Sequence, residues 1–92
     1  MILDTTAILA EFLGTFLVVL TIFASGGNVF FIGAVFTLAL FLVKKYSGGH
    51  LNPAVSVAMY LRGSLSWREL FFYAAAQVTA AAASLYTYRA LA

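Results

Sequence analysis

The sequence predicts an all-α membrane protein made of three transmembrane helices and one re-entrant half-helix. The first observation behind this prediction is composition: of 92 residues, 64% are hydrophobic and 9% are charged, whereas an ordinary globular domain has about 25% charged residues. Too few polar residues are present to cover a water-exposed surface, so lipid must be the solvent of this chain. The second observation is a helix start at Asn52-Pro53, in the middle of otherwise apolar sequence.

The first span is predicted over residues 6–25. This apolar run of 20 residues is interrupted only by Glu11 and a few hydroxyl side chains, and about 20 residues are needed to cross a bilayer. Ser25-Gly26-Gly27-Asn28 is typical of the turn that follows. A cleaved signal peptide is the alternative, but Asp4 precedes the run, no Lys or Arg does, and Glu11 interrupts it.

The second and third spans are predicted over residues 28–46 and 66–89. The second ends in Lys44-Lys45, whose long side chains can extend to the membrane surface. Ser66 and Glu69 have the spacing of a capping box at the start of the third. Aromatic and arginine side chains typical of membrane interfaces lie near the two ends of the third span: Trp67, Arg68, Tyr86, Tyr88 and Arg89.

The half-helix is predicted over residues 53–62, because Asn52 is a good N-cap, Pro53 suits the first helical position and Gly63 offers a stop. Ten helical residues reach about 15 Å, half of the bilayer core. Residues 46–65 are too few for two further crossings and too apolar for a water-exposed loop. We therefore expect this segment to enter the membrane and return, with its irregular backbone buried in protein or lining a water-filled cavity.

Positive charge predicts the orientation. Four of the five Lys and Arg residues flank the half-helix: Lys44, Lys45, Arg62 and Arg68. The fifth, Arg89, lies at the far end of the third span. By the positive-inside rule, the N-terminus and the side from which the half-helix enters are predicted to be cytoplasmic. The net charge of +2 is too small and dispersed to indicate a nucleic-acid partner.

A helix N-terminus within the bilayer carries about half a positive charge and free N–H donors, so it repels cations and attracts acceptor oxygens. Asn52 can cap the helix with its carbonyl oxygen and turn its amide N–H₂ towards a cavity. We expect the backbone of residues 47–51 to be extended and to present successive carbonyl acceptors, with Gly48 and Gly49 allowing close approach. Hydrogen-bond donors at the tip of the half-helix, with carbonyl acceptors along the backbone that leads to it, favour a path for small neutral polar molecules.

Residues 47–55, Ser-Gly-Gly-His-Leu-Asn-Pro-Ala-Val, resemble the first signature loop of the aquaporin, or major intrinsic protein, family. Residues 10–15 resemble the start of that family's first helix, and Ala76-Gln77 resembles part of its third. In the family, two inverted repeats of three spans and a half-helix meet at two Asn-Pro-Ala tips in the middle of the membrane. The resemblance therefore implies that residues 1–92 form one such repeat, the first.

The resemblance also implies which residues contact a permeating molecule. Asn52 would be the donor at the centre of the pore. The other implied contacts are Pro53 and Ala54, which would meet the opposing half-helix, and the carbonyls of Gly48, Gly49 and His50, which would line the cytoplasmic vestibule.

The sequence departs from the family pattern at several positions. Ile32, twenty positions before Asn52, falls at a position of the selectivity constriction where an aromatic side chain is common, which implies a wider or more apolar constriction. Ala80-Ala81 stands where a Gly-Ala pair is usual, and Val55 follows the Asn-Pro-Ala. A second Asn-Pro-Ala, with the filter arginine beside it, does not occur among these residues.

Two polar residues within the spans are predicted to support the loop. Glu11 would either extend to the interface or be buried, and we favour burial, with the carboxylate accepting from backbone N–H groups of the re-entrant segment, as the family's Glu does. Gln77 is predicted to make an interhelical hydrogen bond. His50 is predicted to make a structural hydrogen bond, with a pH-sensitive gate as the alternative. A lone His without Cys predicts no metal site, and no cofactor is predicted.

The leading functional hypothesis is a passive channel for water or small neutral solutes such as glycerol, and not an enzyme. One half-helix cannot enclose a pore, so the chain needs an antiparallel second copy or a complementary half-repeat, and we expect a homo-oligomer. Paired copies would carry Ile32 at both constrictions and no filter arginine, which predicts poorer discrimination between water and glycerol. The alternatives are a non-conducting membrane fragment or assembly partner, and an intramembrane enzyme with Ser47 as nucleophile and His50 as base, although no orienting acid is evident.

Overall fold

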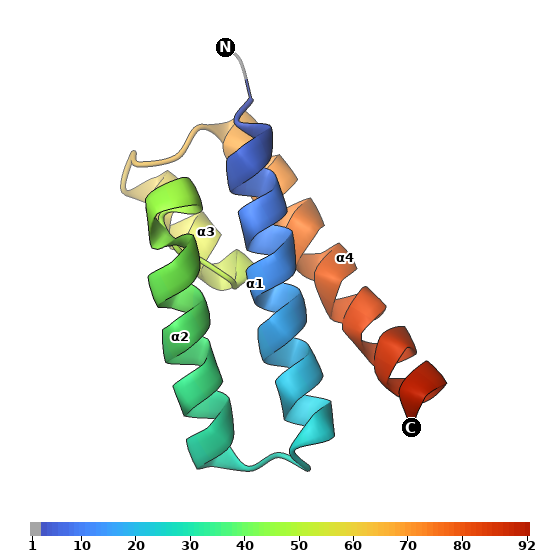
Figure 1. Cartoon of the computed structure of the whole chain (residues 1–92). Helices are drawn as coiled ribbons and strands as arrows, with labels where there is room; N and C mark the ends of the chain where they lie inside the picture. Colours follow the sequence, from blue (N-terminus) through green and yellow to red (C-terminus); the bar gives the residue numbers. More distant parts are fainter. Residues whose placement is uncertain (1–2) are drawn as a thin grey trace.

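The computed structural model describes residues 3–92, and these residues fold into helices joined by short turns (Figure 1). The helices are α1 (Thr5–Ala24), α2 (Val29–Ser47), α3 (Pro53–Leu61) and α4 (Trp67–Leu91). The predicted all-α fold is confirmed, and each observed helix end lies within two residues of the predicted one. α1, α2 and α4 are long and apolar enough to cross a membrane, whereas the nine residues of α3 reach only about 13 Å.

The chain starts each helix with a side chain that accepts from the first turn of the backbone. The capping box predicted at Ser66 and Glu69 is confirmed: the Ser66 hydroxyl accepts from the Glu69 N–H at 3.1 Å, and the Glu69 carboxylate accepts from the Ser66 N–H at 2.9 Å. These local signals explain why the helix starts predicted from the sequence agree so closely with the observed ones.

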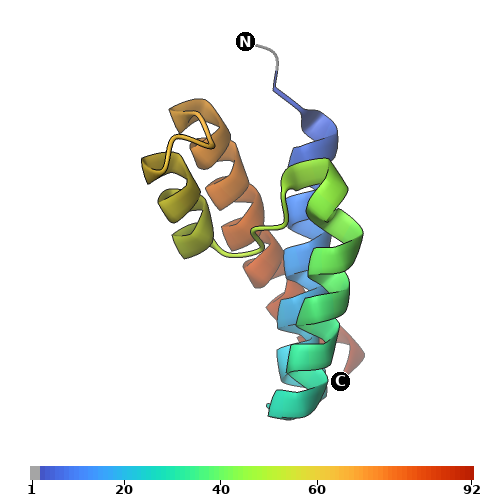
Figure 2. The same ribbon diagram turned by 90° about the vertical axis from the view of Figure 1, so that its left-hand side faces the viewer.

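α1 lies between α2 and α4 and packs against both, whereas α3 packs against α4 (Figure 1). Residues 48–52 descend from the end of α2 to about the middle of the bundle, and α3 then returns to the level from which the chain came, beside the first part of α4 (Figure 2). The end of the bundle where α1 and α4 begin and α2 ends is called the loop end below. The longest dimension, 42 Å, matches a bilayer with its headgroups.

Buried apolar side chains form two small clusters. One lies where the re-entrant segment meets α1 and α2, and the other lies at the loop end: Val18, Ala39, Val43 and Leu51 in the first, Ala7, Leu65 and Tyr73 in the second. Most large apolar side chains of α2 face outward, with Phe30 86% exposed and Phe41 80% exposed. Such a surface requires lipid or a protein partner as its environment.

Candidate functional site

Asn52 is the N-cap of α3, a helix that starts near the middle of the bundle (Figure 2), and the residue is exposed. Its Oδ1 accepts from the Ala54 N–H at 2.8 Å, and its backbone carbonyl accepts from the Ser56 N–H at 3.1 Å. Pro53 occupies the first helical position and is half-buried, whereas Ala54 is exposed. Within residues 3–92 the cap uses only the oxygen of the Asn52 amide, so its two N–H donors can serve another acceptor.

The expectation of an extended backbone before Asn52 is wrong. Gly48, Gly49 and Leu51 have φ values of 89°, 72° and 56°, all in the left-handed region. The reason is that α2 continues through Ser47 and closes at Gly48, whose N–H donates to the carbonyl of Lys44 at 2.8 Å. The few residues left must reverse the direction of the chain before α3 begins, and left-handed residues make that turn.

Leu51 is the one non-glycine residue with positive φ among residues 3–92, a conformation that costs about 1–2 kcal/mol in a residue with a Cβ. Its backbone N–H donates to the Glu11 carboxylate at 2.7 Å, and its side chain is 5% exposed. Gly14 of α1 lies against that side chain, because a Cβ on Gly14 would be 2.5 Å from Leu51 Cδ2. The surrounding contacts therefore hold Leu51 in its strained conformation.

Glu11 lies at the centre of the polar network and is fully buried. Its Oε2 accepts from the Ser47 hydroxyl at 2.5 Å and from the His50 N–H at 3.0 Å. Its Oε1 accepts from the Leu51 N–H at 2.7 Å and from Gln77 Nε2 at 2.8 Å. The alternative in which Glu11 extends to the interface is wrong, because Glu11 is fully buried and four buried donors satisfy its carboxylate.

A second set of hydrogen bonds connects this network to α3 and α4. The Ser56 hydroxyl accepts from Gln77 Nε2 at 2.9 Å and lies 2.8 Å from His50 Nδ1. The Tyr73 hydroxyl donates to the Ser47 carbonyl at 3.0 Å. Sequence reasoning missed Ser56 and Tyr73. Tyr73 precedes Gln77 by one helical turn and shares its face of α4, which is the signal that could have found it.

The geometry does not pair Ser47 with His50 as an enzyme would need. The Ser47 hydroxyl donates to Glu11, and the His50 ring nitrogen lies against Ser56 instead. The proposed nucleophile and base are therefore engaged elsewhere. Among the residues that the structure describes, no group of three His, Cys, Asp or Glu side chains is arranged to hold a metal ion.

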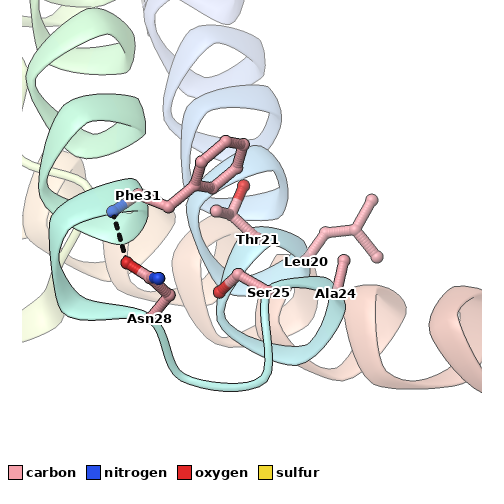
Figure 3. Close-up of a pocket in the computed structure, with 6 residues that line it drawn as sticks. All are labelled: Leu20, Thr21, Ala24, Ser25, Asn28 and Phe31. Carbon is pink, nitrogen blue, oxygen red and sulfur yellow. Dashed lines mark hydrogen bonds between the residues drawn. The ribbon is translucent and has the colours of Figure 1, made fainter.

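Ile32 is half-buried in the first turn of α2, so it lies about 22 Å along the helix axis from Ser47. A cavity of about 470 Å³ lies at that same end of the bundle, between the end of α1 and the start of α2 (Figure 3). Figure 3 shows its lining residues: Leu20, Thr21, Ala24, Ser25, Asn28 and Phe31. Ile32 and the loop residues are not among them.

A second cavity, of about 400 Å³, lies at the loop end. Its lining is mostly polar and includes Ser47, Gly48, His50, Arg62 and Tyr73. The backbone at the end of α2 is therefore accessible to water from this side. The structure thus brings Gly48, Gly49, His50 and Asn52 together in one loop that is held by Glu11, which Gln77 contacts in turn. It leaves Ile32 at the opposite end of α2.

The sequence matches the family described as "Major intrinsic protein" over residues 2–91. It is 39% identical to Aquaporin NIP1-3 of Oryza sativa subsp. japonica, over 91% of this chain and 34% of that protein. It is 40% identical to Aquaporin-9 of Homo sapiens, over 75% of this chain and 28% of that protein. It is 46% identical to the glycerol uptake facilitator protein of Pseudomonas aeruginosa, over 55% of this chain and 19% of that protein. The chain spans about a third or less of these curated relatives. No solved structure gives a significant match.

Proposed function

Because the chain belongs to the major intrinsic protein family, as its Ser-Gly-Gly-His-Leu-Asn-Pro-Ala-Val loop indicated, we propose that it forms one half of a passive channel for water and small neutral solutes. It is a membrane protein, with three apolar helices of spanning length. The relatives named above are aquaporins and a glycerol uptake facilitator, which supports water and glycerol as the solutes and a channel rather than an enzyme. The observation that carries the proposal is the start of α3 in the middle of the bundle, with Asn52 exposed at its tip.

Asn52 is the proposed contact for a permeating molecule at the centre of the pore. Its oxygen caps α3 while its N–H₂ group stays free, so it can donate to water or to a hydroxyl oxygen. The backbone carbonyls of Gly48, Gly49 and His50 are the proposed acceptors on the loop side. The N-terminal dipole of α3 disfavours cations at the same point, and stripping hydration from an ion adds to that barrier.

The pore needs a second half, and the outer surface of α3 supports this part of the proposal. Four apolar residues spaced as one helical face are all exposed: Ala54, Val57, Ala58 and Leu61. Within residues 3–92, α3 packs against α4 and no other helix. We propose that this face, with Pro53 and Ala54 at its tip, meets the half-helix of an antiparallel second copy or of a complementary half-repeat.

Four further features belong to the same proposal. Residues 1–92 form one repeat, and the complete pore is part of a homo-oligomer. Ile32 contributes to a constriction at the end of α2 opposite the loop, where an aliphatic side chain discriminates poorly between water and glycerol. The loop end lies on the cytoplasmic side, because four of the five Lys and Arg residues are near it.

Osmotic flux in proteoliposomes tests the proposal. Asn52→Asp keeps a good helix cap but removes the N–H₂ donor and adds a negative charge, so water flux should fall to that of empty vesicles. Asn28→Asp is the matched control, because Asn28 caps α2 in the same way at the other end of the bundle, and its flux should equal that of the wild type. Wild-type flux no higher than that of empty vesicles would refute the channel and favour the non-conducting assembly partner. Equal flux in Asn52→Asp and wild type would remove Asn52 from the pore.

A further inference from the structure

Tyr73 makes a contact that no other part of α4 makes. Within the described residues, α2 packs against α1 and not against α4. The Tyr73 side chain nevertheless reaches from α4 to the end of α2, where its hydroxyl donates to the Ser47 carbonyl at 3.0 Å. The side chain is 5% exposed, and its ring centre lies 5.1 Å from that of His50. Tyr73 is therefore a buried connection between two helices that are otherwise apart.

The carbonyl that accepts this hydrogen bond belongs to the last residue of α2. The final four carbonyls of a helix have no partner within it and need one elsewhere. The Gly48 N–H satisfies the Lys44 carbonyl, while Tyr73 satisfies that of Ser47. The same carbonyl belongs to the peptide unit that joins Ser47 to Gly48, where φ becomes positive and the chain leaves the helix.

Ser47 is held from two directions. Glu11 of α1 accepts from its hydroxyl at 2.5 Å, and Tyr73 of α4 donates to its carbonyl. The Ser47 hydroxyl in turn accepts from the Gly49 N–H at 3.2 Å. The contacts of Glu11 connect the loop to α1, and the contact of Tyr73 connects the first peptide unit of the loop to α4.

We propose that Tyr73 is a positioning residue that acts through Ser47 to fix residues 48–52, and so to place the Asn52 donor in the pore. The inference rests on the proposed function, because it assigns Tyr73 to the geometry of the same loop. It also separates the roles of two neighbours on α4: Gln77 contacts the carboxylate of Glu11, whereas Tyr73 contacts the loop backbone itself.

Removal of the hydroxyl alone should leave the fold intact. In Tyr73→Phe the ring keeps its place in the buried cluster with Ala7 and Leu65. Ser47 is one of the residues that line the polar cavity of about 400 Å³, so we expect a water molecule to replace the lost donor. The peptide unit then remains hydrogen-bonded but is no longer tied to α4.

Hydrogen exchange and flux together test this role, with Tyr86→Phe as the matched control because Tyr86 lies on the same helix and is 66% exposed. In proteoliposomes, exchange of the backbone amides of residues 49–51 should be about fivefold faster in Tyr73→Phe than in wild type, the factor expected for one neutral hydrogen bond. Water flux per copy should fall, while the thermal midpoint in detergent falls by no more than about 4–8 °C, the shift that about 1 kcal/mol produces in a chain of this size. Tyr86→Phe should change none of the three.

Two results would overturn the inference. One is exchange of residues 49–51 in Tyr73→Phe equal to that of wild type. The other is faster exchange along all of α1 and α4, with a thermal midpoint lowered by more than the shift expected for one hydrogen bond, which would assign Tyr73 a general structural role. If wild type itself conducts no water, the proposed channel fails, and the exchange measurement still decides whether Tyr73 positions the loop.

Discussion

Replacement of Glu11 should be the most damaging single change in the chain, because its buried carboxylate serves four donors. In Glu11→Ala, the backbone N–H groups of His50 and Leu51 lose their acceptor. Each unsatisfied buried donor costs about 1–3 kcal/mol, so these two groups alone should cost about 2–6 kcal/mol. This cost is a large part of the free energy of unfolding of a typical domain, which is about 5–15 kcal/mol.

Glu11→Gln should be intermediate, and the structure gives the reason. The amide oxygen can still accept from the Leu51 N–H and from Gln77, and the new N–H₂ group can donate to the Ser47 hydroxyl. The His50 N–H then faces a donor and has no acceptor, so one unsatisfied group costs about 1–3 kcal/mol. Unfolding by SDS titration, followed by circular dichroism, should therefore rank wild type above Glu11→Gln and Glu11→Gln above Glu11→Ala.

The control for this series is Glu69→Gln. Glu69 takes part in the capping box at the start of α4, and Gln serves equally well at that position, so its unfolding free energy should match the wild type. If Glu11→Gln unfolds like Glu69→Gln, or Glu11→Ala unfolds no more easily than Glu11→Gln, Glu11 does not hold the loop as described.

Three further changes are expected to lower stability by separate mechanisms, each measured as an unfolding free energy in detergent. Gly14→Ala places a Cβ against the Leu51 side chain and should cost about 1–3 kcal/mol. In the control, Gly33→Ala, the new Cβ meets nothing within 4 Å and should cost nothing. Equal effects of the two changes would contradict the close approach at Gly14. Gly48→Ala puts a Cβ on a residue with φ of 89° and should cost about 1–2 kcal/mol, and wild-type stability would mean that the loop turns differently. Ser66→Ala removes the cap of α4 and should cost about 1 kcal/mol, and no loss would show that the capping box is dispensable.

Local chemistry explains why much of the fold is predictable from the sequence. The start of α3 follows from Asn52 and Pro53, and the start of α4 follows from the spacing of Ser66 and Glu69, because each signal acts within one turn of helix. The backbone before Asn52 is harder to predict. Glycine is compatible with extended and left-handed conformations alike, so Gly48 and Gly49 do not by themselves decide between them.

The polar network shows the limit of prediction from sequence in another way. The apolar surroundings of Glu11 indicate that a carboxylate there needs partners, and the hydrogen-bond capacity of Gln77 indicates that it can be one. The contribution of Tyr73 depends on how α4 lies relative to the end of α2. Its hydrogen-bond partner, Ser47, is 26 positions away in the sequence. Helical spacing places Tyr73 on the same face of α4 as Gln77, but its contact with Ser47 follows from the three-dimensional arrangement of the helices.

The most direct test of whether the start of α3 faces water inside the membrane is the reactivity of a single cysteine at position 52. The chain contains no Cys, so Asn52→Cys carries one thiol, and a small, charged, water-soluble thiol reagent added to vesicles can report on it. Ser64→Cys, exposed at the loop end, should react readily, whereas Leu38→Cys, exposed on the outer surface of α2, should not. We predict that Asn52→Cys reacts with this reagent. An unreactive Asn52→Cys, matching Leu38→Cys, would contradict a water-filled passage at the tip of α3.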